Sequence, residues 1–319
     1  MVSVIIPLYN KEEYIRNTLL SVLNQSYQYF EVIIVNDGST DNSIENIQDI
    51  QDRRIRIIHQ QNGGRSLARN NGIKESKYKF VAFLDADDQW NEDFLFNMMD
   101  LIDQYSMYEV FISNYSFYSQ GKYHIALKNK YFSQSKIIDN YFYRSITTPL
   151  VTSNTIVIKK GVFNDVGFFN ETLSMGEDLD MWFRIMLKYQ LVYSPYIGAT
   201  YNLDAVNRTM TYTHYDGNKE FIKSLQNYYS IKGVDYFIKK YIEELAIRDI
   251  MLLSQNVPSV EILNIITFYN QKKMFSFLPR CFRLIYFSPF LIRLAHRMNI
   301  ILYSIVTVGM KKSSHYNLL

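Results

Sequence analysis

The sequence predicts an α/β protein with a mostly parallel, Rossmann-like central sheet flanked by helices, and two observations carry this prediction. First, several short apolar runs rich in β-branched and aromatic residues have the length and composition of buried strands. Second, segments with helical spacing of their apolar residues lie between these runs and are joined to them by short loops. Strands and helices that alternate in this way form parallel sheets with helices on both faces.

Residues 1–105 carry the regular part of this alternation and form the first half of the predicted domain. The strand-like runs here are Val2–Leu8, Phe30–Asp37, Ile55–His59 and Lys79–Asp85. Helices are expected near Ser43–Ile50 and over Leu67–Lys74. Because Glu13 follows Asn10 by three residues, which is the spacing of a capping box, another helix is expected to begin at Asn10.

Residues 106–210 have a less regular pattern and are expected to form the second half of the same domain. The strands expected here are Glu109–Phe117, Tyr123–Leu127, Thr155–Ile158 and Leu191–Tyr196. From residue 211 to 319 the pattern is mostly helical, which predicts a C-terminal helical extension. The single cysteine, Cys281, excludes an internal disulfide and a cysteine-rich zinc site.

A helix with acidic residues in its first turn is expected after Gly176. Apolar residues that include Trp182 recur there at helical spacing and form a stripe that is expected to be buried. Asp178 lies one turn before Trp182 and is therefore expected to point inward. Asp180 lies four residues before Arg184, a spacing typical of an ordinary exposed ion pair.

Acidic residues stand directly after two of the predicted strands. Asp37 ends one run, and the stretch Asp85-Ala86-Asp87-Asp88 ends another. If these strands are parallel, both acidic groups lie at one carboxyl edge of the sheet, where open α/β sheets bind ligands. Carboxylates held close together raise each other's pKa and destabilise the fold unless a cation joins them. We therefore expect a divalent metal at this edge.

Five short motifs lie in order in the first two thirds of the chain, namely Ser3–Asn10 (SVIIPLYN), Val35–Asp41 (VNDGSTD), Asn62-Gly63-Gly64 with Ala68–Gly72 (ARNNG), Asp85–Asp88 (DADD) and Gly176-Glu177-Asp178. Together they resemble the motifs of family 2 glycosyltransferases, and the resemblance covers about residues 1–210. It implies a GT-A fold, a nucleotide-diphosphate sugar donor, Mn²⁺ or Mg²⁺ as cofactor, and transfer with inversion at the anomeric carbon. It also implies that residues 1–105 form the nucleotide-sugar-binding half of the domain and residues 106–210 the acceptor-binding and catalytic-base half.

The resemblance also implies which residues bind the donor. The positions that match are Pro7, Tyr9, Asp37, Asn62, Arg69, Asp85, Ala86 and Asp87. Asp37 is expected to accept the uracil N–H of a UDP-sugar, and Arg69 to reach the nucleotide or its phosphates. Asp87 is expected to be the direct metal ligand, while Asp85 contacts the ribose and the metal shell.

For catalysis, the resemblance assigns the general base to Asp178. The dipole of the predicted helix also favours a carboxylate in this first turn, so capping alone is the structural alternative. Glu177 is expected to hold either the acceptor or Asp178, and Asp88 and Trp90, which follow the metal-binding motif, are expected to be supporting residues. Arg208 lies where the family often has a flexible loop that contacts the diphosphate or the acceptor.

Charge is distributed unevenly along the chain. Residues 262–319 contain eight Lys and Arg and no Asp or Glu, so this segment has a charge of +8. Because the net charge of the whole chain is +3, residues 1–261 carry about −5. Aromatic residues are interleaved with these bases, and apolar stretches such as Leu284–Ile292 suit lipid better than a phosphate backbone. We expect this basic tail to lie on an anionic membrane surface, and we expect no nucleic-acid partner. Packing on the main domain or a homo-oligomer interface is the alternative use of the tail.

The function expected from these features is transfer of a hexosyl or N-acetylhexosaminyl group from a UDP-sugar to a hydroxyl of a glycan, which the basic tail suggests is lipid-linked. Such an enzyme would belong to bacterial surface polysaccharide or lipooligosaccharide synthesis, and would be cytoplasmic and peripheral on the inner face of the plasma membrane. One alternative is a non-catalytic nucleotide-sugar-binding or membrane-scaffolding protein. A processive polysaccharide synthase is disfavoured, because neither Trp90 nor Trp182 stands in a Gln-x-x-Arg-Trp signature.

Overall fold

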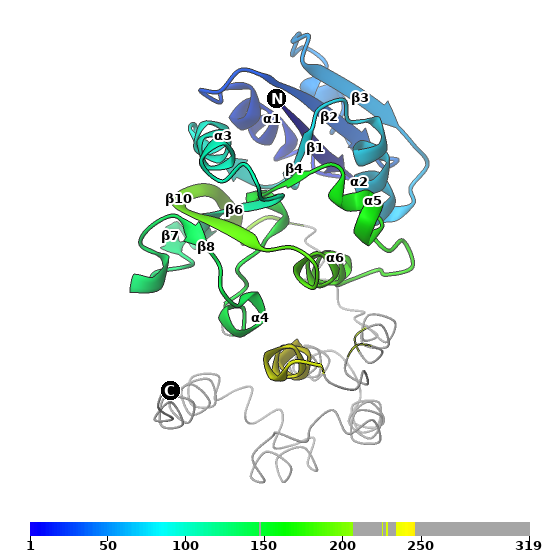
Figure 1. Ribbon diagram of the computed structural model, residues 1–319. Helices are drawn as coiled ribbons and strands as arrows, with labels where there is room; N and C mark the ends of the chain where they lie inside the picture. Colours follow the sequence, from blue (N-terminus) through cyan, green and yellow to red (C-terminus); the bar gives the residue numbers. More distant parts are fainter. Residues whose placement is uncertain (147, 207–224, 226–227, 229–233, 246–319) are drawn as a thin grey trace, which may run out of the picture. The chain divides into compact units, whose positions relative to one another are not determined.

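The computed structural model describes residues 1–146, 148–206, 225, 228 and 234–245 (Figure 1). The chain divides into two units, Met1–Thr211 and Tyr212–Leu319. A ten-stranded sheet with helices on both faces forms the centre of the first unit. In the second unit, residues 236–245 are helical. The predicted α/β class with a Rossmann-like central sheet is confirmed.

The sheet begins with the four parallel strands that the sequence predicts. These strands are β1 (Val2–Leu8), β2 (Phe30–Asn36), β3 (Ile55–His59) and β4 (Phe80–Phe83). They lie in the order β3-β2-β1-β4, and every neighbouring pair is parallel. Their carboxyl ends therefore meet at one edge, which is the edge where ligands bind in open α/β sheets.

The second half of the sheet reverses direction twice. The strands here are β5 (Gln89–Trp90), β6 (Val110–Ser119), β7 (Lys122–Ile125), β8 (Lys136–Ile137), β9 (Ile156–Lys159) and β10 (Leu191–Asn202). β9 is antiparallel to both β4 and β6, and β10 is parallel to β6. Two reversals restore the original direction, so β6 and β10 end at the same edge as β1. β5 and β8 add to β10 and β7 to β6, all antiparallel.

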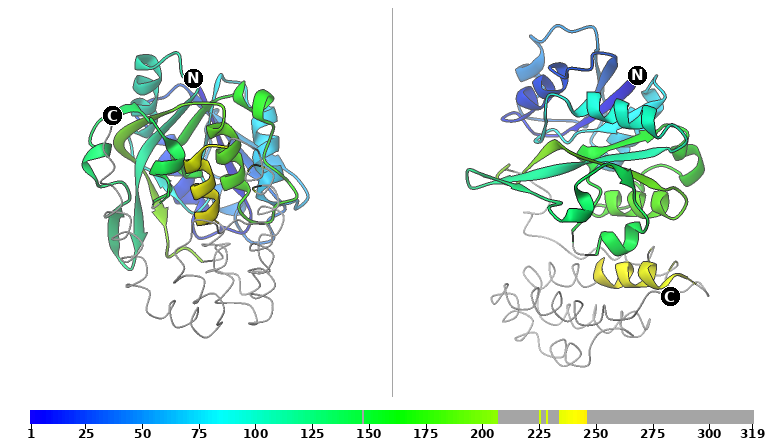
Figure 2. Two further views of the ribbon diagram at one scale, coloured as in Figure 1. Left: turned by 60° about the horizontal axis from the view of Figure 1, so that its bottom comes forward. Right: turned by 60° about the vertical axis from the view of Figure 1, so that its left-hand side comes forward.

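Helices cover both faces of the sheet (Figure 2), and the side chains of each strand alternate between these two faces. The main helices are α1 (Ile15–Leu23), α2 (Gly64–Glu75), α3 (Phe94–Gln104), α4 (Tyr141–Arg144), α5 (Val162–Val166) and α6 (Glu177–Met186), with 3₁₀ turns η1 (Glu45–Ile47), η2 (Lys130–Phe132) and η3 (Ser153–Thr155). Val4 and Ile6 point into the large core that α1 and α3 close. Ile5, between them, contacts α2 on the other face.

An aromatic cluster holds α6 against the sheet. Phe83 of β4 packs edge to face on Phe163 of α5 and on Phe169, with ring centroids 6.2 and 5.5 Å apart. Trp182 of α6 is fully buried and contacts both Phe83 and Phe169. The predicted buried stripe of this helix is confirmed. Its burial fixes the first turn of α6 near the carboxyl end of β4.

Two local expectations are wrong. The first helix begins at Ile15 rather than at Asn10, because Asn10 takes a left-handed conformation (φ 50°) and its Oδ1 accepts a hydrogen bond from the Thr40 N–H at 2.8 Å. Asn10 thus joins two loops instead of capping a helix. The helix expected near residues 43–50 is only the single turn Glu45–Ile47.

The contact between α2 and β1 depends on Gly72, and a substitution there tests it. A Cβ at this position would lie 2.4 Å from Ile5 Cγ2, which is closer than atoms can pack. We expect Gly72→Ala to lower the free energy of unfolding by about 1–3 kcal/mol, as overpacking does in other cores. Urea unfolding monitored by circular dichroism measures this change.

Gly161→Ala is the matched control, because a Cβ there meets nothing within 4 Å and its φ of −59° suits alanine. This variant should be neutral or up to about 1 kcal/mol more stable. Equal destabilisation of both variants would contradict the proposed close approach of α2 to β1.

Candidate active site

The carboxyl edge of the parallel strands brings most of the sequence-predicted residues together. Tyr9 follows β1, Asp37 follows β2 and Asp85 follows β4, and β1 lies between β2 and β4 in the sheet. α6 adds Glu177 and Asp178 from its first turn. A single buried arginine joins the strand ends to this helix.

Arg69 of α2 is that arginine, and its side chain is only 2% exposed. Nη2 donates to Asp85 Oδ1 at 2.8 Å, and Nη1 donates to Glu177 Oε1 at 2.9 Å. Burial by itself would lower the pKa of the guanidinium, but Asp85 and then Glu177 outweigh it and raise the pKa above its ordinary value. Arg69 is therefore a permanent buried cation between two carboxylates, and its expected role toward the nucleotide stays a prediction.

Glu177 is 1% exposed and pairs with two arginines. Besides Arg69, Arg65 places Nε 3.0 Å from Glu177 Oε1. Burial raises the pKa of Glu177 above its ordinary value and Asp178 raises it further, while the two arginines oppose both effects. Glu177 is thus held by two arginines, and its expected contact with the acceptor or with Asp178 stays a prediction.

Asp178 is half-buried at the N-terminus of α6 and is thus less inward than its spacing from Trp182 predicts. Gly176 has a left-handed conformation (φ 75°) that turns the chain into the helix. Asp178 Oδ1 accepts a hydrogen bond from the Leu179 N–H at 2.7 Å. The carboxylate is held by the backbone and the helix dipole, and it keeps access to solvent.

Asp180 forms the ion pair with Arg184 that the sequence predicts, with 2.8 Å between Arg184 Nη2 and Asp180 Oδ2. The expectation that this pair is exposed is wrong, because Asp180 is 5% exposed. Arg184 also donates to the carbonyl groups of Val166 and Phe168, so the loop before α6 closes over the pair. This pair therefore holds α6 to the preceding loop instead of lying on the exposed face of the helix.

Asn154, which sequence reasoning missed, fixes the shape of the acidic loop after β4. Its Oδ1 accepts from the Asp85 N–H at 2.8 Å, its Nδ2 donates to Asp88, and its carbonyl accepts from Trp90 Nε1 at 2.7 Å. Asp88 is 1% exposed, and its Oδ1 also accepts from the Asn202 N–H at 2.7 Å. Asp88 supports the site by holding the loop to the end of β10.

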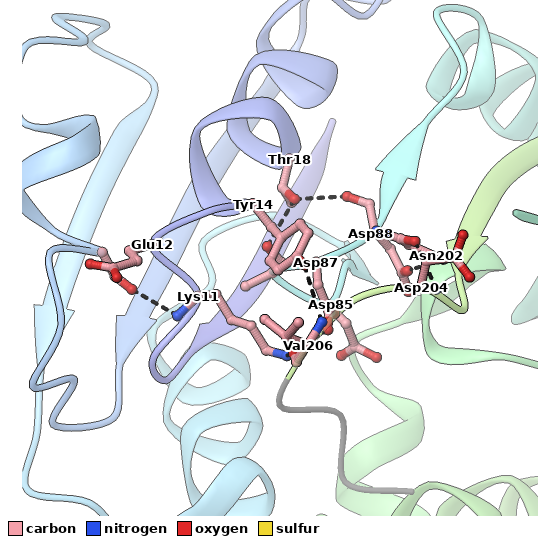
Figure 3. Close-up of polar contacts among 12 residues, drawn as sticks. Lys11, Glu12, Tyr14, Thr18, Asp85, Asp87, Asp88, Asn202, Asp204 and Val206 are labelled. Carbon is pink, nitrogen blue, oxygen red and sulfur yellow. Dashed lines mark hydrogen bonds and ion pairs between the residues drawn. The ribbon is translucent and has the colours of Figure 1, made fainter. Parts of the chain in front are cut away.

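Asp87 is paired with a lysine. Lys11 Nζ lies 2.6 Å from Asp87 Oδ2 and donates to the Val206 carbonyl at 3.1 Å (Figure 3). Lys11 thus pairs with Asp87 as Arg69 pairs with Asp85. The argument that crowded carboxylates require a metal is therefore wrong as it stands, because protein cations already balance them.

The same carboxylates still fit a divalent metal that arrives with a diphosphate. Within the described residues, Oδ2 of Asp85 and Oδ1 of Asp87 accept no hydrogen bond, since each acid gives only its other oxygen to its cation. No group of three or more His, Cys, Asp or Glu side chains that could hold a metal occurs in the described part of the chain. Mg²⁺ commonly binds through one or two carboxylates plus substrate phosphates, so such a group is not required.

Asp37 is 3% exposed and organises the loop after β3. Its Oδ1 accepts from Gln60 Nε2 at 2.7 Å and from the Gly63 N–H at 2.8 Å, and its Oδ2 accepts from the Gly64 N–H at 2.8 Å. A carboxylate has about four acceptor positions, so these bonds leave one on Oδ2. The expected bond of Asp37 to a uracil N–H stays a prediction.

The other predicted donor residues differ in exposure. Tyr9 is 43% exposed and is therefore accessible to a ligand at this edge. Pro7 is half-buried, Asn62 is exposed and Ala86 is buried. Arg208 lies outside the described residues.

Four residues of the site were not predicted, namely Lys11, Gln60, Arg65 and Asn154. Three of them carry a sequence signal: Lys11 and Gln60 are polar residues close after a predicted strand, and Arg65 lies one helical turn before Arg69. Asn154 lies in the irregular half and has no such signal.

Comparison with known proteins places the chain in a family. Residues 3–167, more than half of the chain, match the family described as Glycosyl transferase family 2. The chain therefore belongs to glycosyltransferase family 2.

Its curated relatives include three bacterial glycosyltransferases. GlyG of Streptococcus pneumoniae is 33% identical over 183 residues, which cover 53% of this chain and 60% of that protein. An uncharacterized glycosyltransferase of Rickettsia bellii is 36% identical over 58% of this chain and 26% of that protein. TuaG of Bacillus subtilis, whose name refers to teichuronic acid biosynthesis, is 40% identical over 32% of this chain and 42% of that protein. The chain thus spans less than two thirds of the length of these relatives.

Among solved structures, residues 1–349 of S. aureus TarS in complex with UDP-GlcNAc match with a TM-score of 0.72. The match covers 93% of this chain and 92% of that one at 19% identity. At this identity the likeness shows the fold alone, which is of the GT-A type.

Replacement of Arg69 tests whether this buried cation holds the site together. We expect Arg69→Met to lower the free energy of unfolding by about 3–5 kcal/mol, because it leaves Asp85 and buried Glu177 without their shared partner. The pKa of Glu177, already raised by burial, should rise further. A raised carboxyl pKa favours the folded state at low pH, so the variant should lose stability as the pH increases above about 4.5.

Thermal and urea unfolding at several pH values measure both effects. Arg56→Met is the control, because Arg56 pairs with Glu75 at the surface, where the two side chains are 36% and 52% exposed. That change should cost about 0–1 kcal/mol. An Arg69 variant no less stable than this control would refute the role of Arg69.

Proposed function

We propose that the protein is an inverting glycosyltransferase that moves a sugar from a UDP-sugar to a hydroxyl group of a glycan. We call the carboxyl edge of the parallel strands, where Asp37, Asp85 and Asp87 lie, the donor edge. The observation that carries the proposal is the chain of contacts from Asp178 to this edge. The half-buried Asp178 carboxylate stands beside Glu177, which Arg69 connects to Asp85 at the end of β4. A base and a donor edge held in one rigid arrangement suit an in-line displacement.

In the proposed mechanism Asp178 accepts the proton of an acceptor hydroxyl while that oxygen attacks the anomeric carbon and the nucleotide diphosphate leaves. The backbone bond to Leu179 orients the carboxylate, and its partial exposure lets an acceptor reach it. Asp87, with Asp85 beside it, is the residue that would hold Mn²⁺ or Mg²⁺. A metal bound there supplies positive charge that stabilises the leaving diphosphate.

The assignment of UDP as the leaving nucleotide is supported by Asp37 and Tyr9. Asp37 has one acceptor position left, which a uracil N–H can fill, and the exposed ring of Tyr9 offers a stacking surface. Arg69 is committed to two protein carboxylates, so we assign it to the support of Asp85 rather than to the phosphates. The structural relative TarS 1–349, which was solved with UDP-GlcNAc and with UDP, adds support by analogy.

For the acceptor we propose a lipid-linked glycan of a bacterial surface polysaccharide. The support is the basic, aromatic tail of residues 262–319, which lies outside the described residues, together with the name of the relative TuaG. The enzyme would then work as a peripheral protein on the inner face of the plasma membrane. In the described part of the chain no helix is both long and apolar enough to cross a bilayer.

Substitution of Asp178 tests the enzyme proposal against the non-catalytic alternative. Asp178→Asn preserves shape but cannot take a proton, so we expect transfer to fall about 10²–10⁴-fold. Binding of UDP should be unchanged, because Asp178 does not belong to the donor edge. The assay follows UDP release and labelled-sugar incorporation into an acceptor fraction from bacterial envelopes.

Asp165→Asn serves as the control, because Asp165 of α5 is exposed and its side chain contacts only Lys188 and Tyr189 among the described residues, both outside the candidate site. Its activity should equal that of the wild type. Full activity in the Asp178 variant would exclude this residue as the base, and absence of turnover in the wild type with every UDP-sugar would favour a binding or scaffolding protein.

The membrane proposal predicts that the full chain sediments with vesicles that contain phosphatidylglycerol and not with pure phosphatidylcholine. Each basic residue near the headgroups contributes about 1 kcal/mol, so binding should weaken strongly at about 1 M salt, where the screening length is about 3 Å. Deletion of residues 262–319 should abolish sedimentation. Persistent binding of the truncated protein would refute the role of the tail.

A further inference from the structure

The proposed function assigns the Asp87 carboxylate to the metal, but this carboxylate already forms an ion pair with Lys11. Lys11 Nζ lies 2.6 Å from Asp87 Oδ2, and the two side chains are 13% and 14% exposed. The same ammonium group donates to the carbonyl of Val206 at 3.1 Å (Figure 3). A protein cation therefore lies against the carboxylate to which a divalent ion would bind.

The two cations at this edge differ in how firmly they are held. Arg69 is 2% exposed and is fixed by Asp85 and Glu177 together. Lys11 reaches Asp87 on a flexible four-carbon stem from the loop after β1, and it is closer to solvent. Of the two, Lys11 is the cation that can leave its carboxylate at the lower cost.

Two positive charges repel each other at short range, so a divalent ion and the Lys11 ammonium cannot both lie against Asp87 without a further anion. A nucleotide diphosphate provides that anion, and lysine is a common point-charge partner of phosphate. The metal and the diphosphate would thus displace Lys11 from Asp87 only when they arrive together.

We propose that Lys11 is an exchangeable cation of the donor site, which neutralises Asp87 in the empty enzyme and transfers to the donor diphosphate when a metal takes Asp87. This rests on the proposed function, namely the use of a nucleotide-diphosphate donor with a divalent metal. Lys11 then makes metal binding conditional on the donor. Its move also releases the Val206 carbonyl, which leaves the end of this segment held by the bond from the Val206 N–H to Tyr14 Oη at 3.1 Å.

The test is Mn²⁺ binding to the full-length protein, read by electron paramagnetic resonance of free Mn²⁺. In the wild type, Mn²⁺ alone should bind weakly, and saturating UDP should tighten its binding by at least about tenfold. Lys11→Met removes the charge and keeps the apolar stem, so this variant should bind Mn²⁺ without UDP at least about tenfold more tightly than the wild type. Lys11→Arg keeps the charge and should behave like the wild type.

Asp87→Asn in the Lys11→Met background should abolish the gained Mn²⁺ binding, which ties the effect to this carboxylate. Tight Mn²⁺ binding to the wild type without UDP would overturn the proposal, and so would equal Mn²⁺ affinities of the wild type and a folded Lys11→Met variant. The wild-type measurement decides the question even if that variant does not fold. Absence of UDP binding to the wild type under all conditions would refute the proposed function itself, whereas normal UDP binding with either contrary Mn²⁺ result refutes only the role of Lys11.

Discussion

A single buried cation, Arg69, determines how the two halves of this site fit together. It is fully enclosed and lies between the carboxylate at the end of β4 and the carboxylate in the first turn of α6. A buried charge is tolerated only when it is paired. If either acidic residue moved away from Arg69, buried charges would lose a partner and the fold would lose much of its stability. The position of Asp178 relative to the donor edge follows from this constraint, because Asp178 is the next residue after Glu177.

Several acidic side chains at this edge bond to other parts of the protein and thereby hold the site in shape. Asp37 accepts three hydrogen bonds from the loop after β3, and Asp88 joins the loop after β4 to β10. Asp85 and Asp87 are each neutralised by one protein cation. Among the described residues of this edge, acceptor capacity remains at one position of Asp37, at one oxygen each of Asp85 and Asp87, and at the half-exposed carboxylate of Asp178. The proposed function assigns the nucleotide, the metal and the acceptor to these positions.

The sequence predicts the parallel half of the sheet well, because strands such as β1 and β2 are buried on both faces and read as continuous apolar runs. It also predicts which acidic residues gather at the edge, since the carboxyl ends of parallel strands must meet. It fails where long-range contacts override local signals. Asn10 has the spacing of a helix cap but bonds to Thr40 across two loops. The burial of Asp180 depends on a loop that Arg184 closes, and no pattern near Asp180 reveals it.

The central claim is that the carboxyl edge binds a uridine diphosphate with the help of a metal, and calorimetric titration tests it most directly. UDP titrated into the full-length protein should bind in the presence of Mn²⁺ and more weakly without it, and uridine, which lacks the diphosphate, should show no dependence on Mn²⁺. In Asp87→Ala the advantage given by Mn²⁺ should disappear. UDP that fails to bind with or without Mn²⁺ would contradict the assignment of this edge as the donor site.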